Sequence, residues 1–440
     1  MSRLPEERPQ IVVLSTCDTK LAETLFLREQ ILKNGTCSVL LLDVGRTPIQ
    51  HRDIDLSCTD LARGPLPSSS SDAEAGADLS KMPRAEYIKY MTSCATAYIR
   101  NLFTSAHIHG IVAAGGSCGT ALATAVMRDA LPVGFPKLMV STMASGDVKP
   151  FVEETDITLM YSVVDIAGTN SILKQILSNA AGAIVGATVA YYNNSNNNNN
   201  NKSRGASLHL NSKRVGITMF GVTTPCVDAI RSHLQDRYGY EVYVFHATGS
   251  GGKAMERLVR EKQLDAVLDI TTTEVADELV GGVLTAGPER LTAAAQAGIP
   301  QIVSVGACDM VNFGPRDTVP AKFVQTNRRL YEHNPAVTLM RTSPDECAQI
   351  AAFIANKLRA HVSRPDLVRV LLPTGGVSMI ATPGQPFHDP EADSALFVGL
   401  EKQLEGSGIE VRRDDRAIND AEFAVLAAES LVELIGRSEG

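Results

Sequence analysis

The chain has 440 residues, of which 44% are hydrophobic and 20% charged, and its net charge is -8 at pH 7. This composition is typical of an ordered globular protein of two or three domains and excludes a largely disordered chain. The acidic balance lacks the clustered Lys and Arg that nucleic acids and anionic membranes attract, so we expect neither as a partner.

The N-terminus indicates a protein that stays in the cytoplasm. Its first ten residues, MSRLPEERPQ, are charged and lack the apolar stretch of a secretory signal. The longest apolar run, at 180–192, falls short of the roughly 20 residues that span a bilayer, so no transmembrane helix is predicted. The 8 cysteines form no CxxC pair, which favours reduced thiols over disulfides or a zinc site.

In chain order, short runs rich in Val, Ile and Leu end in loops of small polar residues and precede helix-like segments. This pattern is typical of βα units in a parallel sheet. The predicted strands are 11–16, 38–44, 110–116 and 136–142 in the first half, and 214–220, 240–247, 265–273 and 300–307 in the second. The pattern therefore predicts an α/β fold with two doubly wound domains, built on mainly parallel sheets and facing each other across a cleft.

An Asn tract at 193–201 separates the two halves, and it cannot bury apolar surface to offset its ordering entropy. We therefore predict an N-terminal nucleotide-binding domain over 1–190, a disordered linker over 191–213 and a C-terminal α/β domain over 214–440.

The halves also resemble each other weakly, 109–120 matching 264–277 and 134–147 matching 298–312. Two explanations of this likeness are open: a repeated domain, or convergence of unrelated halves on one βα pattern. In open α/β sheets ligands bind at the carboxyl ends of the strands, so we expect function in the loops found there.

The first such loop is STCDTK at 15–20, followed by a predicted helix from Leu21. Thr16, Asp18 and Thr19 are of the types that cap helices, and a helix start attracts anions. Lys20 can supply positive charge to a phosphate, and Asp18 a hard oxygen to Mg²⁺. The structural alternative is that Asp18 only caps the helix.

The second loop is GGSCGT at 115–120, where glycines and hydroxyls let backbone amides approach a ligand closely. The predicted phosphate-binding residues are Gly115, Gly116, Ser117, Gly119 and Thr120, joined at the same edge by Ser141, Thr142, Gly146 and Asp147. A tight packing turn is the alternative. No GxxxxGK[ST] or GxGxxG motif is present at these loops, so the residues alone indicate a phosphate or another anion.

Polar residues also follow the strands of the second half, and there they suit general acid/base chemistry on a small polar substrate. The candidate catalytic residues are His246, Glu256, Glu274 and Asp309. The same residues suit the binding of a polar ligand, and a lone His beside a strand is commonly structural. The segments LPTGGVSMI (372–380) and FHDP (387–390) are expected either to complete this second site or to shape the fold.

The strand-end motifs together resemble one uncharacterised family, typified by the ATP-binding N-terminal region of the tomato protein that inhibits tobamovirus RNA replication. The motifs are STCDTK, GGSCGT, STMASGD, SVVDIAGTN, TMFGVTTPCV, VFHATGSGGKAME, LDITTTEVAD, VGACDMVNFGP and INDAEFA. The resemblance implies two Rossmann-like domains, ATP bound by the first, and a homodimer. It departs at Cys118, since the family loop usually reads GGSGGT.

Two functions follow from this reading. The first is an ATP-binding protein, with Mg²⁺, that has an enzymatic role on a small polar substrate across the interdomain cleft. The second is a non-catalytic, nucleotide-dependent protein-binding or regulatory module.

Overall fold

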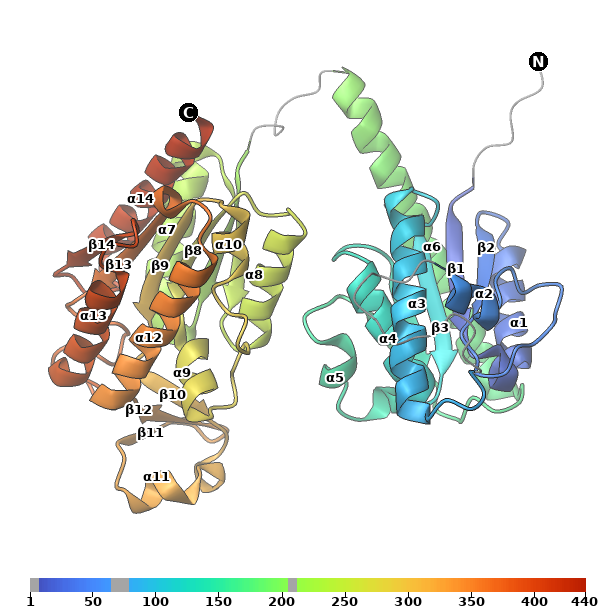
Figure 1. Ribbon diagram of the computed structural model, residues 1–440, viewed down its shortest axis with the longest axis horizontal. Helices are drawn as coiled ribbons and strands as arrows, with labels where there is room; N and C mark the ends of the chain where they lie inside the picture. The colour runs from blue at the N-terminus through green and yellow to red at the C-terminus, as the bar shows by residue number, and fades with distance from the viewer. Residues whose placement is uncertain (1–7, 65–78, 205–211) are drawn as a thin grey trace. The chain divides into compact units, whose positions relative to one another are not determined.

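A computed structural model describes residues 8–64, 79–204 and 212–440. The chain divides into two compact units, Met1–Leu208 and His209–Gly440 (Figure 1). Both units are α/β, and each is built around its own parallel sheet. All eight strands predicted from the sequence are confirmed.

The N-terminal unit holds a five-stranded parallel sheet with the strand order β2-β1-β3-β4-β5. The strands are β1 (Gln10–Ser15), β2 (Ser38–Asp43), β3 (Gly110–Gly115), β4 (Lys137–Ser141) and β5 (Thr158–Tyr161). The helices are α1 (Cys17–Lys33), α2 (Cys58–Arg63), α3 (Arg84–Thr104), α4 (Ser117–Ala130), α5 (Lys149–Val152) and α6 (Ser171–Arg204). The sequence did not predict β5, a short edge strand that is largely exposed.

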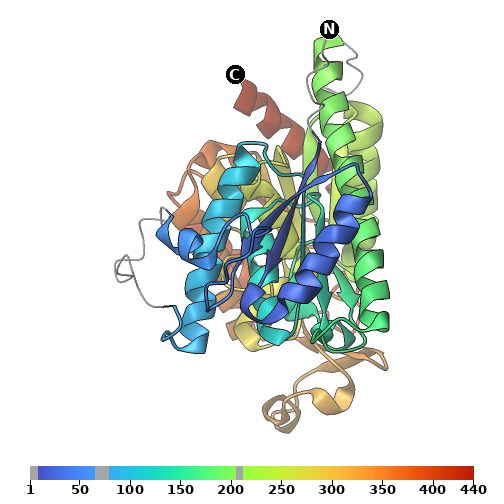
Figure 2. The ribbon, with the colours of Figure 1, turned by 90° about the vertical axis from the view of Figure 1, so that its right-hand side faces the viewer.

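Successive side chains of each strand pack on opposite faces of this sheet. Ile11 and Val13 lie in the core beneath α1 and α6, whereas Val12 and Leu14 lie in the core beneath α3 and α4. Figure 2 shows α1 and α6 side by side on one face. Both faces are therefore covered, which makes the unit doubly wound and explains why its strands read as continuous apolar runs.

Helix α6 extends beyond the apolar run at 180–192 in both directions. Its segment Ser171–Asn196 is long and apolar enough to cross a membrane by length and composition, a test that core helices of soluble proteins also pass. Leu173, Leu177 and Ile184 on this helix are buried against the sheet. The helix continues through the Asn tract to Arg204, where a disordered linker was predicted, because a nucleated helix extends at little cost per residue. The part of the predicted linker at 205–211 lies outside the described residues.

The C-terminal unit holds a six-stranded parallel sheet with the order β14-β13-β9-β8-β6-β7. Its strands are β6 (Arg214–Met219), β7 (Glu241–His246), β8 (Ala266–Thr271), β9 (Gln301–Gly306), β13 (Val368–Pro373) and β14 (Glu410–Asp414). The order β7-β6-β8-β9 repeats β2-β1-β3-β4 of the first unit. The weakly similar segments thus lie at equivalent strands, β3 with β8 and β4 with β9.

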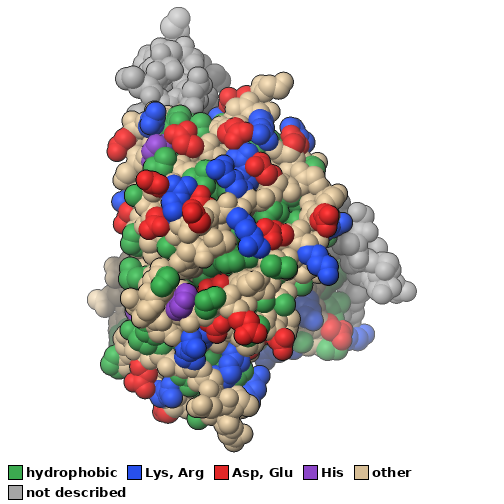
Figure 3. All heavy atoms as spheres, turned by 90° about the vertical axis from the view of Figure 1, so that its left-hand side faces the viewer, with side chains coloured by type: hydrophobic (Ala, Val, Ile, Leu, Met, Phe, Trp, Pro, Cys, Tyr) green, Lys and Arg blue, Asp and Glu red, His purple; other side chains and the backbone are tan. Residues whose placement is uncertain are grey.

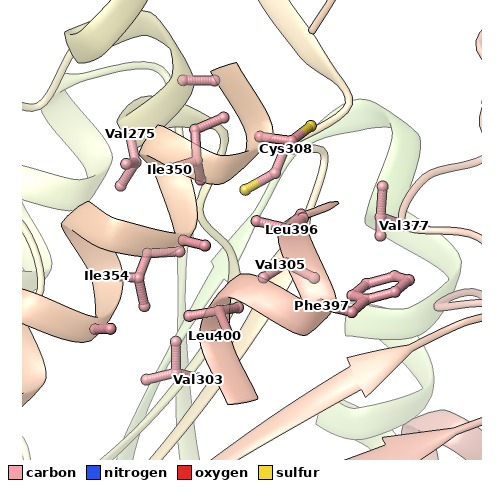
Figure 4. Packing of buried hydrophobic residues seen from close by; sticks show 14 of the residues in the cluster. Val275, Val303, Val305, Cys308, Ile350, Ile354, Val377, Leu396, Phe397 and Leu400 are labelled. Atoms are coloured by element: carbon pink, nitrogen blue, oxygen red, sulfur yellow. The ribbon is translucent and has the colours of Figure 1, made fainter. Parts of the chain in front are cut away.

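Helices cover both faces of this second sheet as well. They are α7 (Thr224–Tyr238), α8 (Ser250–Arg260), α9 (Thr273–Val280), α10 (Ala293–Ala297), α12 (Pro344–His361), α13 (Pro390–Leu404) and α14 (Ala421–Glu439). Val303 and Val305 of β9 pack beneath α12 and α13, where Ile354 and Leu400 meet them (Figure 4).

An antiparallel sheet is inserted between β9 and α12, in the order β10-β12-β11. It consists of β10 (Met310–Phe313), β11 (Leu330–Asn334) and β12 (Val337–Arg341), with the short helix α11 (Ala321–Gln325). On the face of the C-terminal unit in Figure 3, acidic and basic side chains are interspersed rather than gathered by sign.

Candidate functional site

The strand order of the N-terminal sheet places a switch point between β1 and β3. From β1 the chain passes to β2 on one side, and from β3 it passes to β4 on the other. The two loops that follow β1 and β3 therefore leave the sheet in opposite directions, and open α/β sheets bind ligands in the crevice between such loops. These are the loops 16–20 and 116–120 that the sequence singled out, and the end of β4 lies next to them.

On the β1 side, an internal carboxylate already occupies the start of the helix. Asp43 Oδ1 accepts hydrogen bonds from the backbone N-H of Cys17, the first residue of α1, at 3.0 Å and from that of Gly45 at 2.8 Å. Burial raises the pKa of Asp43, and these two amides oppose the rise. The start of α1 is thus already bound to a negative charge, which disfavours a phosphate there.

Asp18 ties the first turn of α1 to the loop after β2. Its Oδ2 accepts the backbone N-H groups of Arg46 at 2.9 Å and Thr47 at 3.2 Å. Asp18 therefore does not cap its own helix, contrary to the structural alternative from the sequence. Thr16 is the N-cap residue of α1 but makes no side-chain cap, and its hydroxyl lies 3.2 Å from that of Thr19.

Lys20 interrupts α1 with a non-helical backbone, φ -132° and ψ 23°. Its side chain is half-buried, and its ammonium has no hydrogen bond or ion pair within residues 8–64, 79–204 and 212–440. A cation without a partner beside the switch point is available to an anionic ligand.

On the β3 side, the helix start is open. Gly116 is the N-cap of α4, no side chain caps it, and the first turn contains no acidic residue. A Cβ added at Gly116 would meet only Thr142 Oγ1 at 3.8 Å, and one added at Gly119 would meet nothing within 4 Å. The first amides of a helix have no acceptor within the helix, so those of Ser117 and Cys118 are available to a ligand.

Two further features of this loop have structural roles. A Cβ at Gly115 would lie 3.2 Å from Gly119 Cα, so glycine at 115 permits close packing of β3 on α4. Cys118 lies within α4 and is absent from the described non-glycine residues with positive φ. Cysteine at this position therefore introduces no backbone strain.

The hydroxyls of Thr120 and Ser141 brace the loops and are themselves completely buried. Their Oγ atoms are 2.6 Å apart, and Thr120 Oγ1 also donates to the Gly116 carbonyl at 2.9 Å. Thr120 and Ser141 therefore hold the glycine turn at 116–119 in place through buried hydrogen bonds. Beyond them, Gly146 and Asp147 are exposed, and Asp147 Oδ1 accepts the Lys149 N-H at 3.0 Å.

In the C-terminal unit, Glu274 is enclosed by the glycine loop at the start of α8. Its Oε1 accepts the N-H groups of Gly249 at 2.7 Å and Gly252 at 3.1 Å, and its Oε2 accepts Arg290 Nε at 2.8 Å. A Cβ on Gly252 would lie 2.0 Å from Glu274 Oε2. The Glu274 carboxylate thus requires glycine at 252, whereas Gly249 and Gly251 lie close to the backbone carbonyls of Thr285 and His246.

Glu256 belongs to the same buried network. Its Oε2 accepts the Ala293 N-H at 2.7 Å, and its Oε1 accepts the Leu291 N-H at 2.5 Å and Arg290 Nη1 at 3.4 Å. Arg290 is 1% exposed and also forms a two-pronged pair with Asp269. Burial raises the pKa of both glutamates, which the Arg290 charge opposes.

Sequence reasoning missed Arg290, which no quoted motif contains, and it gave no role to Asp269, although LDITTTEVAD includes it. Every carboxylate oxygen of Glu256 and Glu274 has a partner, so the geometry favours a structural role over catalysis.

The other two catalytic candidates lie apart. His246 is exposed at the end of β7, and its ring stacks on Phe220 with centroids 5.6 Å apart. Asp309 follows β9, and β8 and β6 separate that strand from β7. Asp309 Oδ2 accepts the Ser378 hydroxyl at 2.8 Å, and burial raises the pKa of Asp309 to about 6.

In the C-terminal unit, the loop that follows β13 packs over the switch point of the sheet. The Met379 N-H donates to the Val222 carbonyl at 3.0 Å, and the Ala307 N-H donates to the Val377 carbonyl at 2.9 Å. Phe387 is fully buried in the same apolar cluster. Of the two switch points, the one in the N-terminal unit therefore has the more open helix start.

Together these features define a protein of two Rossmann-like, doubly wound α/β units with an uncapped glycine turn at the switch point of the first. The chain belongs to the uncharacterised protein family UPF0261, whose N-terminal domain matches residues 9–193 and whose C-terminal domain matches 212–435.

Relatives extend along the whole chain. A UPF0261 protein of Clostridium tetani is 41% identical over 97% of this chain and 99% of its own length. The tomato ToMV resistance protein Tm-1(GCR237) is 38% identical over 100% of this chain, which spans 57% of the tomato protein.

Among solved structures, a UDP-GlcNAc 2-epimerase from Neisseria meningitidis bound to UDP-GlcNAc matches with 12% identity. The match covers 67% of this chain and 82% of that one, at a TM-score of 0.21. A likeness this low has no bearing on the function of this chain.

Proposed function

We propose that the N-terminal unit binds ATP, with its phosphates on the first turn of α4. The observation that supports this is the contrast between the two helix starts at the switch point. The start of α1 is bound to the Asp43 carboxylate, whereas that of α4 has an uncapped Gly116 and no acidic residue in its first turn. An open helix start beside glycines is a favourable anion site.

The α1 side of the crevice offers a carboxylate, Asp18, and a cation, Lys20, which together suit a metal-bound phosphate. Asp18 Oδ1 has no hydrogen bond within the described chain, and Mg²⁺ on a nucleotide commonly takes one or two carboxylates besides the phosphates. No group of three or more His, Cys, Asp or Glu is placed to hold a metal within the described residues. Asp18 therefore fits Mg²⁺ that arrives with the nucleotide, and Lys20 fits a phosphate oxygen. The family resemblance favours ATP over other phosphates.

Thermal unfolding with Mg²⁺ and ATP, ADP, GTP or inorganic phosphate tests this site, because a ligand that binds the native state raises its melting temperature. We expect ATP to raise it and Gly116→Val to abolish the rise, since the added side chain would cover the open amides. Gly221→Val is the matched control, because Gly221 follows β6 in the second unit and has open space around it. If ATP leaves the wild-type melting temperature unchanged, or if Gly116→Val keeps the full rise, the proposal is wrong.

Whether the bound nucleotide serves catalysis distinguishes the two functions derived from the sequence. The enzymatic role on a small polar substrate now depends on His246 and Asp309, because the oxygens of Glu256 and Glu274 are all engaged. Because these carboxylate oxygens are already hydrogen-bonded within the protein, the structure gives support to the alternative, a non-catalytic module that binds a protein partner. The test is the rate of ATP hydrolysis by the wild type, His246→Ala and Asp309→Asn. A rate that either substitution lowers at least tenfold would support the enzyme. Equal rates at the background level in the wild type and both variants would support the module.

We also propose that the chain acts as a cytoplasmic homodimer, as the family resemblance implies. Sedimentation of the purified protein at micromolar concentration should give twice the mass of the 47.0 kDa chain. A monomer under these conditions would refute the dimer without affecting the nucleotide site.

A further inference from the structure

The C-terminal unit contains a cavity whose lining residues are remote in sequence from those of the proposed nucleotide site. It has a volume of about 270 Å³ and lies between the turn after β13 and the start of α13. Its lining includes Thr374, Gly376, His388, Asp393, Phe397 and Arg413. Both LPTGGVSMI and FHDP, which the sequence predicted either to complete the second site or to shape the fold, contribute to it.

Two hydrogen-bond acceptors in this cavity have no partner of their own. Asp393 is only 8% exposed; its Oδ1 pairs with Arg341 at 2.5 Å, and its Oδ2 has no hydrogen bond within residues 8–64, 79–204 and 212–440. His388 Nδ1 lies 3.2 Å from the Ala381 carbonyl. Because a carbonyl only accepts, Nδ1 is the donor in this hydrogen bond, and in the neutral imidazole Nε2 is then an acceptor.

Each of the two charged side chains in the lining, Asp393 and Arg413, is already in an ion pair, which disfavours an ionic ligand. The Asp393 carboxylate is paired with Arg341, and the Arg413 guanidinium donates two hydrogen bonds of 2.6 Å to Glu401. A neutral ligand that donates hydrogen bonds therefore suits the lining better than a cation or an anion.

The backbone amides at the cavity are also unavailable to a phosphate. The N-H groups of Thr374, Gly375 and Gly376 donate to the carbonyls of Asp414, Arg416 and Pro373. Asp389 caps α13 by accepting the Ala392 N-H at 3.1 Å, so this helix start already faces a carboxylate. The glycine turn thus differs from the open turn at Gly116.

We propose that this cavity binds a small neutral polyhydroxylated molecule. Two of its hydroxyls would donate to Asp393 Oδ2 and His388 Nε2, and its C-H face would rest on the apolar lining that includes Phe397. Carboxylate and imidazole acceptors beside an aromatic side chain match such alternating polar and apolar surfaces. Pockets for drug-sized ligands have volumes of about 300–1,000 Å³, so this slightly smaller cavity suits a molecule with one ring.

Saturation-transfer NMR on the full chain tests the ligand class, with D-glucose and myo-inositol as neutral probes, putrescine as a cation and succinate as an anion. We expect transfer to at least one neutral probe, and His388→Gln should weaken its affinity about tenfold, the cost of one buried hydrogen bond. His361→Gln is the matched control, because His361 lies in the same unit but away from the cavity.

Asp393→Asn should weaken binding similarly. It also leaves Arg341 without its charge partner, so His388→Gln decides the outcome if this variant does not fold. Transfer to neither neutral probe, transfer to putrescine or succinate alone, or an affinity that His388→Gln leaves unchanged would each overturn the proposal. None of these results depends on ATP, so the nucleotide proposal stands or falls separately.

Discussion

Asp43, at the end of β2, binds the first N-H of α1 through a carboxylate oxygen 3.0 Å from Cys17 N. The same oxygen accepts the Gly45 N-H, so one buried side chain holds the helix start and the following loop together. In the proposed nucleotide site, this contact disfavours a phosphate at the start of α1 and leaves the start of α4 as the open position.

The Asp43 contact predicts a loss of stability on truncation. Asp43→Ala leaves two buried amides without an acceptor and should lower the free energy of unfolding by about 1–3 kcal/mol, measured in urea. Asp129→Ala is the control, since Asp129 is exposed on α4 and should change stability by less than about 0.5 kcal/mol. Equal effects of the two substitutions would show that Asp43 does not stabilise the helix start.

Lys20 should contribute to nucleotide affinity because its ammonium has no internal partner. Titration calorimetry with Mg²⁺ and ATP should show Lys20→Ala raising Kd about tenfold, in line with the loss of one charge-assisted hydrogen bond. Lys33→Ala, at the far end of the same helix and paired with Glu29, should leave Kd unchanged. An unchanged Kd for Lys20→Ala would remove this residue from the site.

Glu274 should matter for folding rather than for turnover. Glu274→Gln removes one charge from the buried Arg290 network and turns an acceptor oxygen into a donor, so we expect a loss of about 3–5 kcal/mol in the unfolding of the C-terminal unit. Glu289→Gln, on an exposed residue next to Arg290, is the control. A Glu274→Gln protein with wild-type stability but impaired catalysis would restore the catalytic interpretation.

The sequence predicted eight of the eleven parallel strands that the structure describes, because buried parallel strands read as apolar runs that end in small polar residues, and it missed β5, β13 and β14. It could not predict the Arg290 network, whose acidic members lie 16 to 34 residues from the arginine and share no motif with it. It also could not separate the two loops at the N-terminal switch point. The residue that distinguishes them, Asp43, is 26 residues from Cys17 and becomes a neighbour only when β2 pairs with β1.

The antiparallel insertion was missed for a related reason. Strands β10 to β12 are short and antiparallel, with β10 paired to β12 across a long connection and β11 paired to β12 in a tight hairpin, so their pattern lacks the βα alternation on which the prediction depended. The catalytic assignment of the glutamates was made on residue type and strand-end position alone. Burial and pairing, which decide their role, are tertiary properties.

Asp309 should make the stability of the C-terminal unit depend on pH. Its pKa is about 6 in the folded protein and 3.8 in its ordinary state, so the folded form retains the proton between these values. A raised carboxyl pKa favours the folded state fully below pH 3.8, and this contribution is lost as pH rises toward 6. The difference corresponds to a contribution on the order of 3 kcal/mol.

Asp309→Asn keeps an acceptor for Ser378 but cannot ionise, so the contribution of Asp309 is the difference between the pH profiles of the two proteins. In urea unfolding, the wild type should lose stability relative to Asp309→Asn between about pH 4 and pH 6, with no further divergence above pH 7. Asp317→Asn, on an exposed residue of the insertion, should give a profile parallel to the wild type. A parallel profile for Asp309→Asn would mean that Asp309 ionises as readily in the folded chain as in the unfolded one, so that burial does not raise its pKa.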